Sequence, residues 1–98
     1  MDMNEITEKV RGKVGDSSGL NATLKFHCGD DGVVVIDGRA VPNTVDNTDR
    51  DTDCTIVITR ENLAAMLAGD LDPVAGFMTG KFRVEGDMSV ALKLQRVV

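Results

Sequence analysis

The stretch from Asp53 to Gln95 constrains the fold most, because short apolar strands alternate in it with short, capped helices. Strands are predicted at 54–59, where β-branched residues gather, and at 81–85. Helices are predicted at 60–68, from Asp72-Pro73 to Gly80, and from Met88 to about Val97. The stretch contains no visible arrangement of catalytic side chains. It therefore predicts a fold but no reaction.

The first half of the chain predicts one amphipathic helix and three strands. Apolar residues at positions 3, 6, 10 and 14 fall on one helical face. From Leu20 to Cys28 apolar and polar residues alternate, which is typical of a half-buried strand, and Val33 to Ile36 forms the next strand. A third strand is predicted from Arg39 to Val45, interrupted at Pro42.

This order of elements predicts an α+β fold in one domain that spans residues 1–98. Hairpin signals at Asp31-Gly32 and Asp37-Gly38 favour a five-stranded, mainly antiparallel sheet, covered on one face by short helices. The final predicted helix has two apolar faces and therefore needs two apolar neighbours. Met88, Ala91, Leu92 and Gln95 lie on one face, and Val90, Leu94, Val97 and Val98 on the other.

Charge and composition exclude several classes of partner. The net charge is -5 and no basic run is present, which argues against nucleic acid and against strong electrostatic docking on anionic membranes. No apolar run approaches the roughly 18 residues of a membrane span. The N-terminus, Met1 to Glu5, is polar and acidic and unlike a signal peptide, so we expect a cytoplasmic protein with reduced cysteines.

Three patterns resemble sites of known chemistry but fail in detail. Asp49, Asp51 and Asp53 have calcium-loop spacing, but the glycine and the final acidic residue of that loop are absent. The glycines of Gly76–Lys81 are spaced one residue too closely for a phosphate loop. His27 and Cys28 are neighbours on a strand and would point to opposite faces. We therefore expect no metal site, no cofactor and no catalytic activity.

Over a stretch of about 45 residues, the chain resembles the sterol carrier protein 2 domain family in the order, spacing and type of its residues. The positions that carry this resemblance are Asp53-Cys54-Thr55-Ile56, Gly69, Asp72-Pro73, Phe77-Met78, Gly80-Lys81-Phe82, Val84, Gly86-Asp87-Met88 and Ala91-Leu92-Lys93-Leu94-Gln95. The chain ends at Arg96-Val97-Val98, without the longer tail or peroxisomal signal of eukaryotic members, so we expect a short, stand-alone member.

The resemblance implies a hydrophobic tunnel between sheet and helices, and a carrier that binds fatty acids, fatty acyl-CoAs, sterols or related lipids with little selectivity. We expect the lipid tail to contact Met66, Phe77, Met78, Met88, Ala91 and Leu92, and Gln95 to face a head group or bond to backbone. Transient contact with a membrane or an acyl-handling enzyme would follow. The alternative is an interaction module with the same fold and no lipid cavity, in which the last helix packs on a partner such as a second copy.

Overall fold

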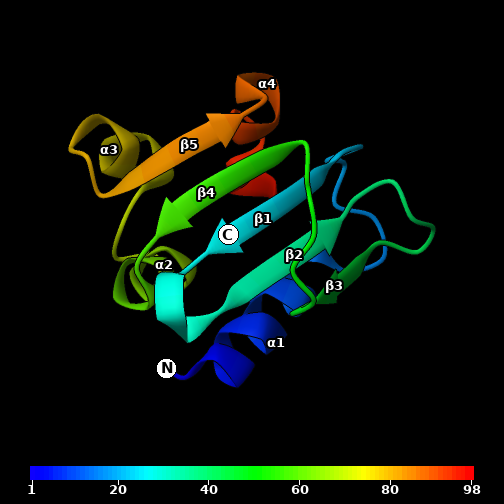
Figure 1. Ribbon diagram of the computed structural model, residues 1–98, viewed down its shortest axis with the longest axis horizontal. Helices are drawn as coiled ribbons and strands as arrows, with labels where there is room; N and C mark the ends of the chain where they lie inside the picture. The colour runs from blue at the N-terminus through cyan, green and yellow to red at the C-terminus, as the bar shows by residue number, and fades with distance from the viewer.

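The computed structural model describes residues 1–98 as a five-stranded sheet with helices packed on it (Figure 1). The strand order is β3-β2-β1-β4-β5. The strands are β1 (Thr23–His27), β2 (Val33–Asp37), β3 (Thr44–Asp46), β4 (Cys54–Ile58) and β5 (Phe82–Gly86). The α-helices are α1 (Met3–Val14), α2 (Arg60–Ala68), α3 (Pro73–Met78) and α4 (Met88–Ala91), and the 3-10 helices are η1 (Gly29–Asp31) and η2 (Leu94–Arg96).

The predicted α+β class is confirmed, and the sheet is mainly antiparallel. Strands β1 and β2, β2 and β3, and β4 and β5 pair antiparallel, whereas the central pair of β1 and β4 is parallel. In that parallel pair Phe26 lies beside Ile56, and both side chains are fully buried. The alternation of buried and half-buried residues along β1 and β4 follows the pleat of a strand with one face on the core.

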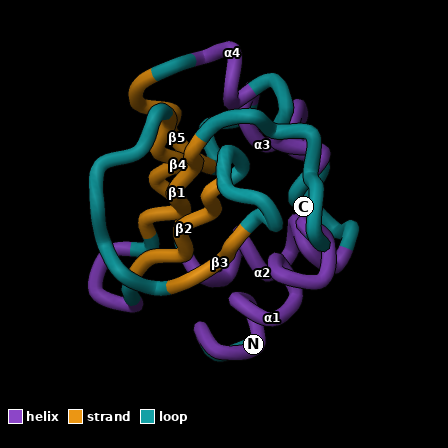
Figure 2. The backbone as a smooth tube through the Cα atoms, turned by 90° about the vertical axis from the view of Figure 1, so that its right-hand side faces the viewer, coloured by secondary structure: helices purple, strands orange, loops and turns teal.

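The four α-helices lie on one side of the sheet (Figure 2). Side chains from α1, α2 and the C-terminal segment pack there with Leu24, Phe26 and Ile56 in one apolar cluster. On the opposite side Val33 and Val35 are also buried, although they lie outside that cluster. The loop before β4 is tied to this second side, because Lys25 Nζ donates to Asp49 Oδ1 at 2.8 Å and to the Arg50 carbonyl at 2.9 Å.

Several predicted elements are shorter in the structure. Strand β1 spans Thr23–His27, whereas the sequence pattern predicted a strand from Leu20 to Cys28. The third strand begins only at Thr44, because residues 38–43 form a loop in which Asn43 Nδ2 donates to the Ala40 carbonyl at 2.8 Å. Helix α3 ends at Met78, two residues before Gly80. The final helix is not continuous to Val97: α4 ends at Ala91, and η2 follows after Leu92 and Lys93.

The two cysteines are free and buried, as expected. In the parallel register Cys54 lies beside Leu24, and Cys28 is four residues further along β1. At about 3.3 Å per residue the two cysteines are roughly 13 Å apart along the strands, well beyond the ~7 Å limit between disulfide-bonded Cα atoms. A Cys28–Cys54 bridge is therefore incompatible with this sheet.

Candidate functional site

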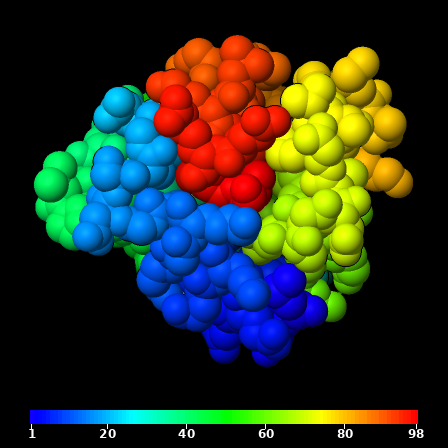
Figure 3. Space-filling view, turned by 180° about the vertical axis from the view of Figure 1, so that it is seen from behind, coloured from blue at the N-terminus to red at the C-terminus, as the bar shows by residue number.

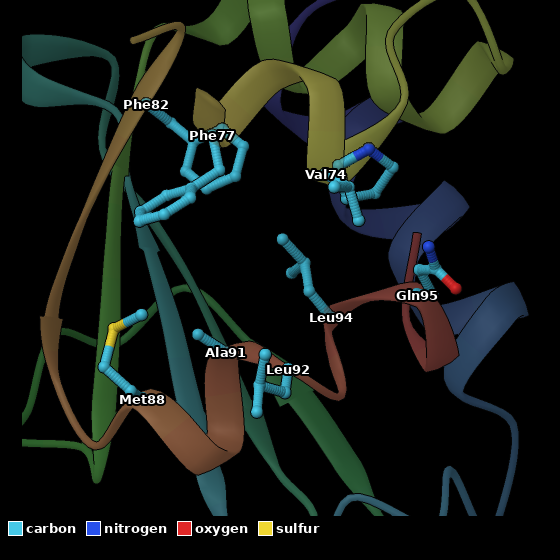
Figure 4. A pocket seen from close by; sticks show the side chains of 9 residues that line it. Val74, Phe77, Phe82, Met88, Ala91, Leu92, Leu94 and Gln95 are labelled. Carbon is cyan, nitrogen blue, oxygen red and sulfur yellow. The ribbon is translucent and has the colours of Figure 1, made fainter. Parts of the chain in front are cut away.

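An apolar cavity of about 360 Å³ lies between α3, β5 and the C-terminal segment formed by α4 and η2 (Figure 4). Seven of its nine lining residues are hydrophobic. The lining residues are Pro73, Val74, Phe77, Phe82, Met88, Ala91, Leu92, Leu94 and Gln95. Its size and apolar character fall in the range of small-molecule binding sites, at the lower end in volume.

Helix α3 forms one wall of this cavity, and its ends are fixed by local hydrogen bonds. The Asp72 carboxylate accepts from the Ala75 N–H at 3.0 Å, and Pro73 occupies the first helical turn, where no N–H is needed. Gly76 is buried in this helix, and a Cβ atom there would lie 3.2 Å from the Phe82 ring. The absence of a side chain at Gly76 thus lets α3 approach β5 closely.

The aromatic pair of Phe77 and Phe82 closes the end of the cavity against β5. The two ring centroids are 6.0 Å apart with planes inclined by 44°. Phe82 is 8% exposed and belongs to the core, whereas Phe77 is 46% exposed. The pair therefore joins the interior of the protein to a surface that solvent or a ligand can reach.

The C-terminal segment forms the opposite wall and divides its two faces between the core and the cavity. Val90, Leu94 and Val97 are buried in the core. The Asp87 carboxylate caps α4 by accepting from the Ser89 N–H at 2.9 Å, and its hydrogen bonds with the Ser89 side chain and N–H lower its pKa below the usual range. Met88, Ala91, Leu92 and Gln95 line the cavity, and of the residues on the other face only Leu94 also reaches it.

Exposed apolar side chains gather on α3 and at the start of the C-terminal segment. Seven large hydrophobic residues of the chain are exposed, and five of them lie there: three on α3, one on α4 and one directly after α4. These five are Val74, Phe77, Met78, Met88 and Leu92. Leu92 is 82% exposed and Met78 79%, which are high values for apolar side chains gathered in one place.

Five of the seven residues predicted to bind ligand line this cavity. They are Phe77, Met88, Ala91, Leu92 and Gln95. Met66 instead is 3% exposed and packs in the core, where it borders a neighbouring cavity. Met78 is on the outer surface of α3 and does not line the cavity.

Four lining residues were missed at the sequence level: Pro73, Val74, Phe82 and Leu94. Val74 lies three residues before Phe77 and so shares its helical face, a spacing that could have identified it. Leu94 was assigned to the other face of the last helix, and it reaches the cavity because that helix is interrupted before it.

The neighbouring cavity, of about 320 Å³, lies between α2, the start of α3 and the C-terminal end of the chain. Five of its ten lining residues are hydrophobic. Its lining residues are Lys13, Met66, Leu67, Ala68, Gly69, Leu71, Asp72, Pro73, Gln95 and Val98. Pro73 and Gln95 line both cavities, so the two adjoin.

A wider groove of about 720 Å³ lies at the ends of β1 and β4 and the start of β5, and four of its 12 lining residues are hydrophobic. It contains His27 and Cys28, whose surroundings do not favour nucleophilic chemistry. Burial, and then the nearby charges of Asp31 and Glu61, raise the pKa of the Cys28 thiol to about 11. The thiol is therefore protonated near neutral pH, and His27 Nδ1 accepts instead from the Gly29 N–H at 3.3 Å.

Residues 3–98 match the SCP-2 sterol transfer family. The chain belongs to this family. It shares 39% identity over 51 residues with sterol carrier protein 2 of Oryctolagus cuniculus, and this match covers 52% of the chain and 9% of that relative. The chain thus spans a small part of the length of the curated relatives that it matches. Family membership supports lipid binding or transfer in general as the class of function.

Solved structures show the same fold along almost the whole chain. The palmitated SCP2L2 of Aedes aegypti superposes with a TM-score of 0.74 at 20% identity, covering 99% of this chain and 94% of that one. The sterol carrier protein domain 2 of Helicoverpa armigera superposes with a TM-score of 0.72 at 22% identity, covering 94% and 80%. No helix of this SCP-2 family member is long and apolar enough to cross a membrane.

Proposed function

We propose that this SCP-2 family member is a non-catalytic, weakly selective carrier that binds one lipid in the cavity between α3 and α4. The candidate ligands are fatty acids, fatty acyl-CoAs, sterols and related lipids. The observation that carries the proposal is the apolar cavity of about 360 Å³, whose mouth is lined by exposed Val74, Phe77, Met88 and Leu92. Exposed apolar side chains are unfavourable in water, and a lipid tail would cover them.

Burial of the lipid tail supplies the driving force. Each methylene removed from water contributes about 0.8 kcal/mol. Taking a methylene as roughly the size of a water molecule in the liquid, about 30 Å³, the cavity holds on the order of a dozen such groups. Ordering of the ligand offsets part of the gain, so micromolar affinity with weak selectivity is the expected outcome. The tunnel expected from the family would form as the lipid displaces the mouth residues.

Movement of α3 would admit and release the ligand. Gly69 and Gly80 flank this helix and have φ angles of 84° and 74°. Glycine adopts positive φ angles without steric strain, so both residues can change conformation and act as hinges. Gly76, the third glycine of the segment, lies inside α3 and packs against Phe82 and Leu71. It would therefore move together with α3 and would not act as a hinge.

Native mass spectrometry of protein purified without delipidation tests the proposal, followed by displacement of a fluorescent fatty acid with palmitate. We expect one bound lipid per chain and saturable displacement. Ala91→Trp fills the cavity from a half-buried lining position and should abolish uptake while the circular dichroism spectrum is retained. A bare mass with no saturable uptake by the wild-type protein would rule out the carrier.

A dimerisation module is the second candidate, and Met78 favours it. This side chain is 79% exposed beside the cavity mouth but outside its lining, so a lipid in the cavity would leave it in water. A second copy packed over Val74, Met78 and Leu92 would cover it. Light scattering across a concentration series separates the two candidates: a dimer that Met78→Lys dissociates, in protein that takes up no lipid, would favour the module.

A further inference from the structure

The lipid cavity and its neighbour adjoin, and their linings differ in charge. Pro73 and Gln95 are shared by both linings and mark the junction. In the space-filling view the C-terminal segment lies between α1 and the α2–α3 region (Figure 3). Gln95 makes no side-chain hydrogen bond within the chain, so its amide is free to bond to a molecule that passes from one cavity to the other.

The end at α3 and α4 has no charged lining residue, whereas the other end contains Lys13. Lys13 is in the last turn of α1 and has no acidic side chain within ion-pair distance. Asp72 is the one acidic side chain at this end, and its carboxylate accepts from the Ala75 N–H as the cap of α3. The neighbouring cavity therefore contains an ammonium group that forms no ion pair within the chain, because the Asp72 carboxylate of the same lining lies beyond ion-pair distance.

We propose that the two adjoining cavities together bind a single-chain amphiphile with an anionic head group, with its tail among Phe77, Met88 and Leu92 and its head group at Lys13. This inference rests on the proposed function, and it adds the direction of the ligand and the residue that holds its head group. The reverse direction places an anion against apolar side chains with no cation in reach, and desolvation of an unpaired carboxylate is costly. Gln95 then lies beside the part of the molecule that joins head group to tail.

The first test compares palmitate with hexadecanol, which has the same tail and no charge. Lys13→Gln should weaken palmitate binding about three- to fivefold, as expected for an exposed ion pair, and leave hexadecanol binding unchanged. Lys9→Gln is the matched control, because Lys9 is exposed on the same helix and lines neither cavity. Equal effects of Lys13→Gln and Lys9→Gln on palmitate, or equal losses for acid and alcohol, would overturn the inference.

The second test reads the direction of the ligand by NMR. Stearate with a nitroxide near its terminal methyl should broaden the Met88 methyl signal, and stearate with a nitroxide near its carboxylate should broaden the amides of Lys13 and Gly69. The reversed pattern would overturn the assigned direction while leaving the carrier intact. Absence of saturable binding of any of these probes to the wild-type protein would overturn both the carrier and the inference.

Discussion

Thr23 and Asp53 exchange two hydrogen bonds in opposite directions at the start of the parallel strand pair. The Thr23 N–H donates to Asp53 Oδ2 at 2.9 Å, and the Asp53 N–H donates to Thr23 Oγ1 at 2.8 Å. The same carboxylate lies 2.9 Å from the Arg39 guanidinium. The Asp53 carbonyl accepts from the Asp87 N–H at 2.9 Å, one residue before α4. Asp53 thus connects the centre of the sheet to the wall of the cavity.

Asp53→Asn is expected to lower stability at neutral pH and to flatten its dependence on acid. Hydrogen bonds from Thr23, and then the charge of Arg39, hold the pKa of Asp53 below its ordinary value of 3.8. Because the folded pKa is depressed, the contribution is complete above 3.8 and is lost as pH falls through the lower folded value. Urea unfolding across that pH range measures this loss of stability.

The matched control is Asp51→Asn, which removes an exposed acidic side chain two residues away that forms no ion pair. Equal acid sensitivity of the two variants would show that the Thr23–Asp53 bonds do not stabilise the fold.

Gly76→Val is expected to destabilise the protein by about 1–3 kcal/mol, because added atoms would crowd the Phe82 ring and Leu71. Gly76→Ala should be close to neutral. Alanine favours a helix over glycine by about 1 kcal/mol, which offsets a Cβ placed 3.2 Å from the ring. Thermal unfolding of both variants measures these two effects. A Gly76→Val protein as stable as wild type would mean that α3 does not need to approach β5 so closely.

The sequence was sufficient for most strands of the sheet, because their signals are local. The alternation in β1 was confirmed as a strand with the expected buried face, and the β-branched run of β2 was confirmed as a strand. The parallel pairing of β1 and β4 had no local signal, because it depends on which strands meet after the β2–β3 hairpin. The contact of Gly76 with Phe82 also depends on tertiary packing, so no local sequence pattern predicts it.

The last helix shows where local reasoning failed. Its residues have no glycine or proline between Met88 and Val98, so nothing in the pattern stops it. In the structure the Lys93 ammonium donates to the Leu20 carbonyl at 3.3 Å, and Val97 is fully buried. A helix of about ten residues is marginal on its own, so tertiary contacts decide its shape. The break brings Leu94 to the cavity, which explains why this residue was missed.

Leu92→Asp is expected to weaken lipid binding about tenfold or more while leaving stability nearly unchanged. The side chain is 82% exposed and so contributes little to the folded core, but a bound tail would bury it, and burial of a leucine side chain is worth about 1.5–3 kcal/mol. Val41→Asp is the control, because Val41 is 97% exposed and far from the cavity lining. Palmitate titrations that respond equally to both variants would place the lipid elsewhere.

Alkaline pH is expected to destabilise the fold through its two buried thiols. Burial raises the pKa of Cys28 and of Cys54 to about 11 from the ordinary 9.0, with smaller effects from Asp31 near Cys28 and Asp87 near Cys54. Because the folded pKa is raised, both thiols contribute fully below 9.0, and the contribution is lost as pH rises through about 11. The loss is on the order of 2–3 kcal/mol per thiol.

Urea midpoints across this alkaline range test the thiol effect, with Cys28→Ala/Cys54→Ala as the comparison. The double variant loses some core packing at all pH values, so only the slope of stability against pH is diagnostic. The chain has no Tyr, and lysines, which also titrate there, are common to both proteins. A wild-type slope that the double variant reproduces would assign the alkaline loss to lysines instead of to the cysteines.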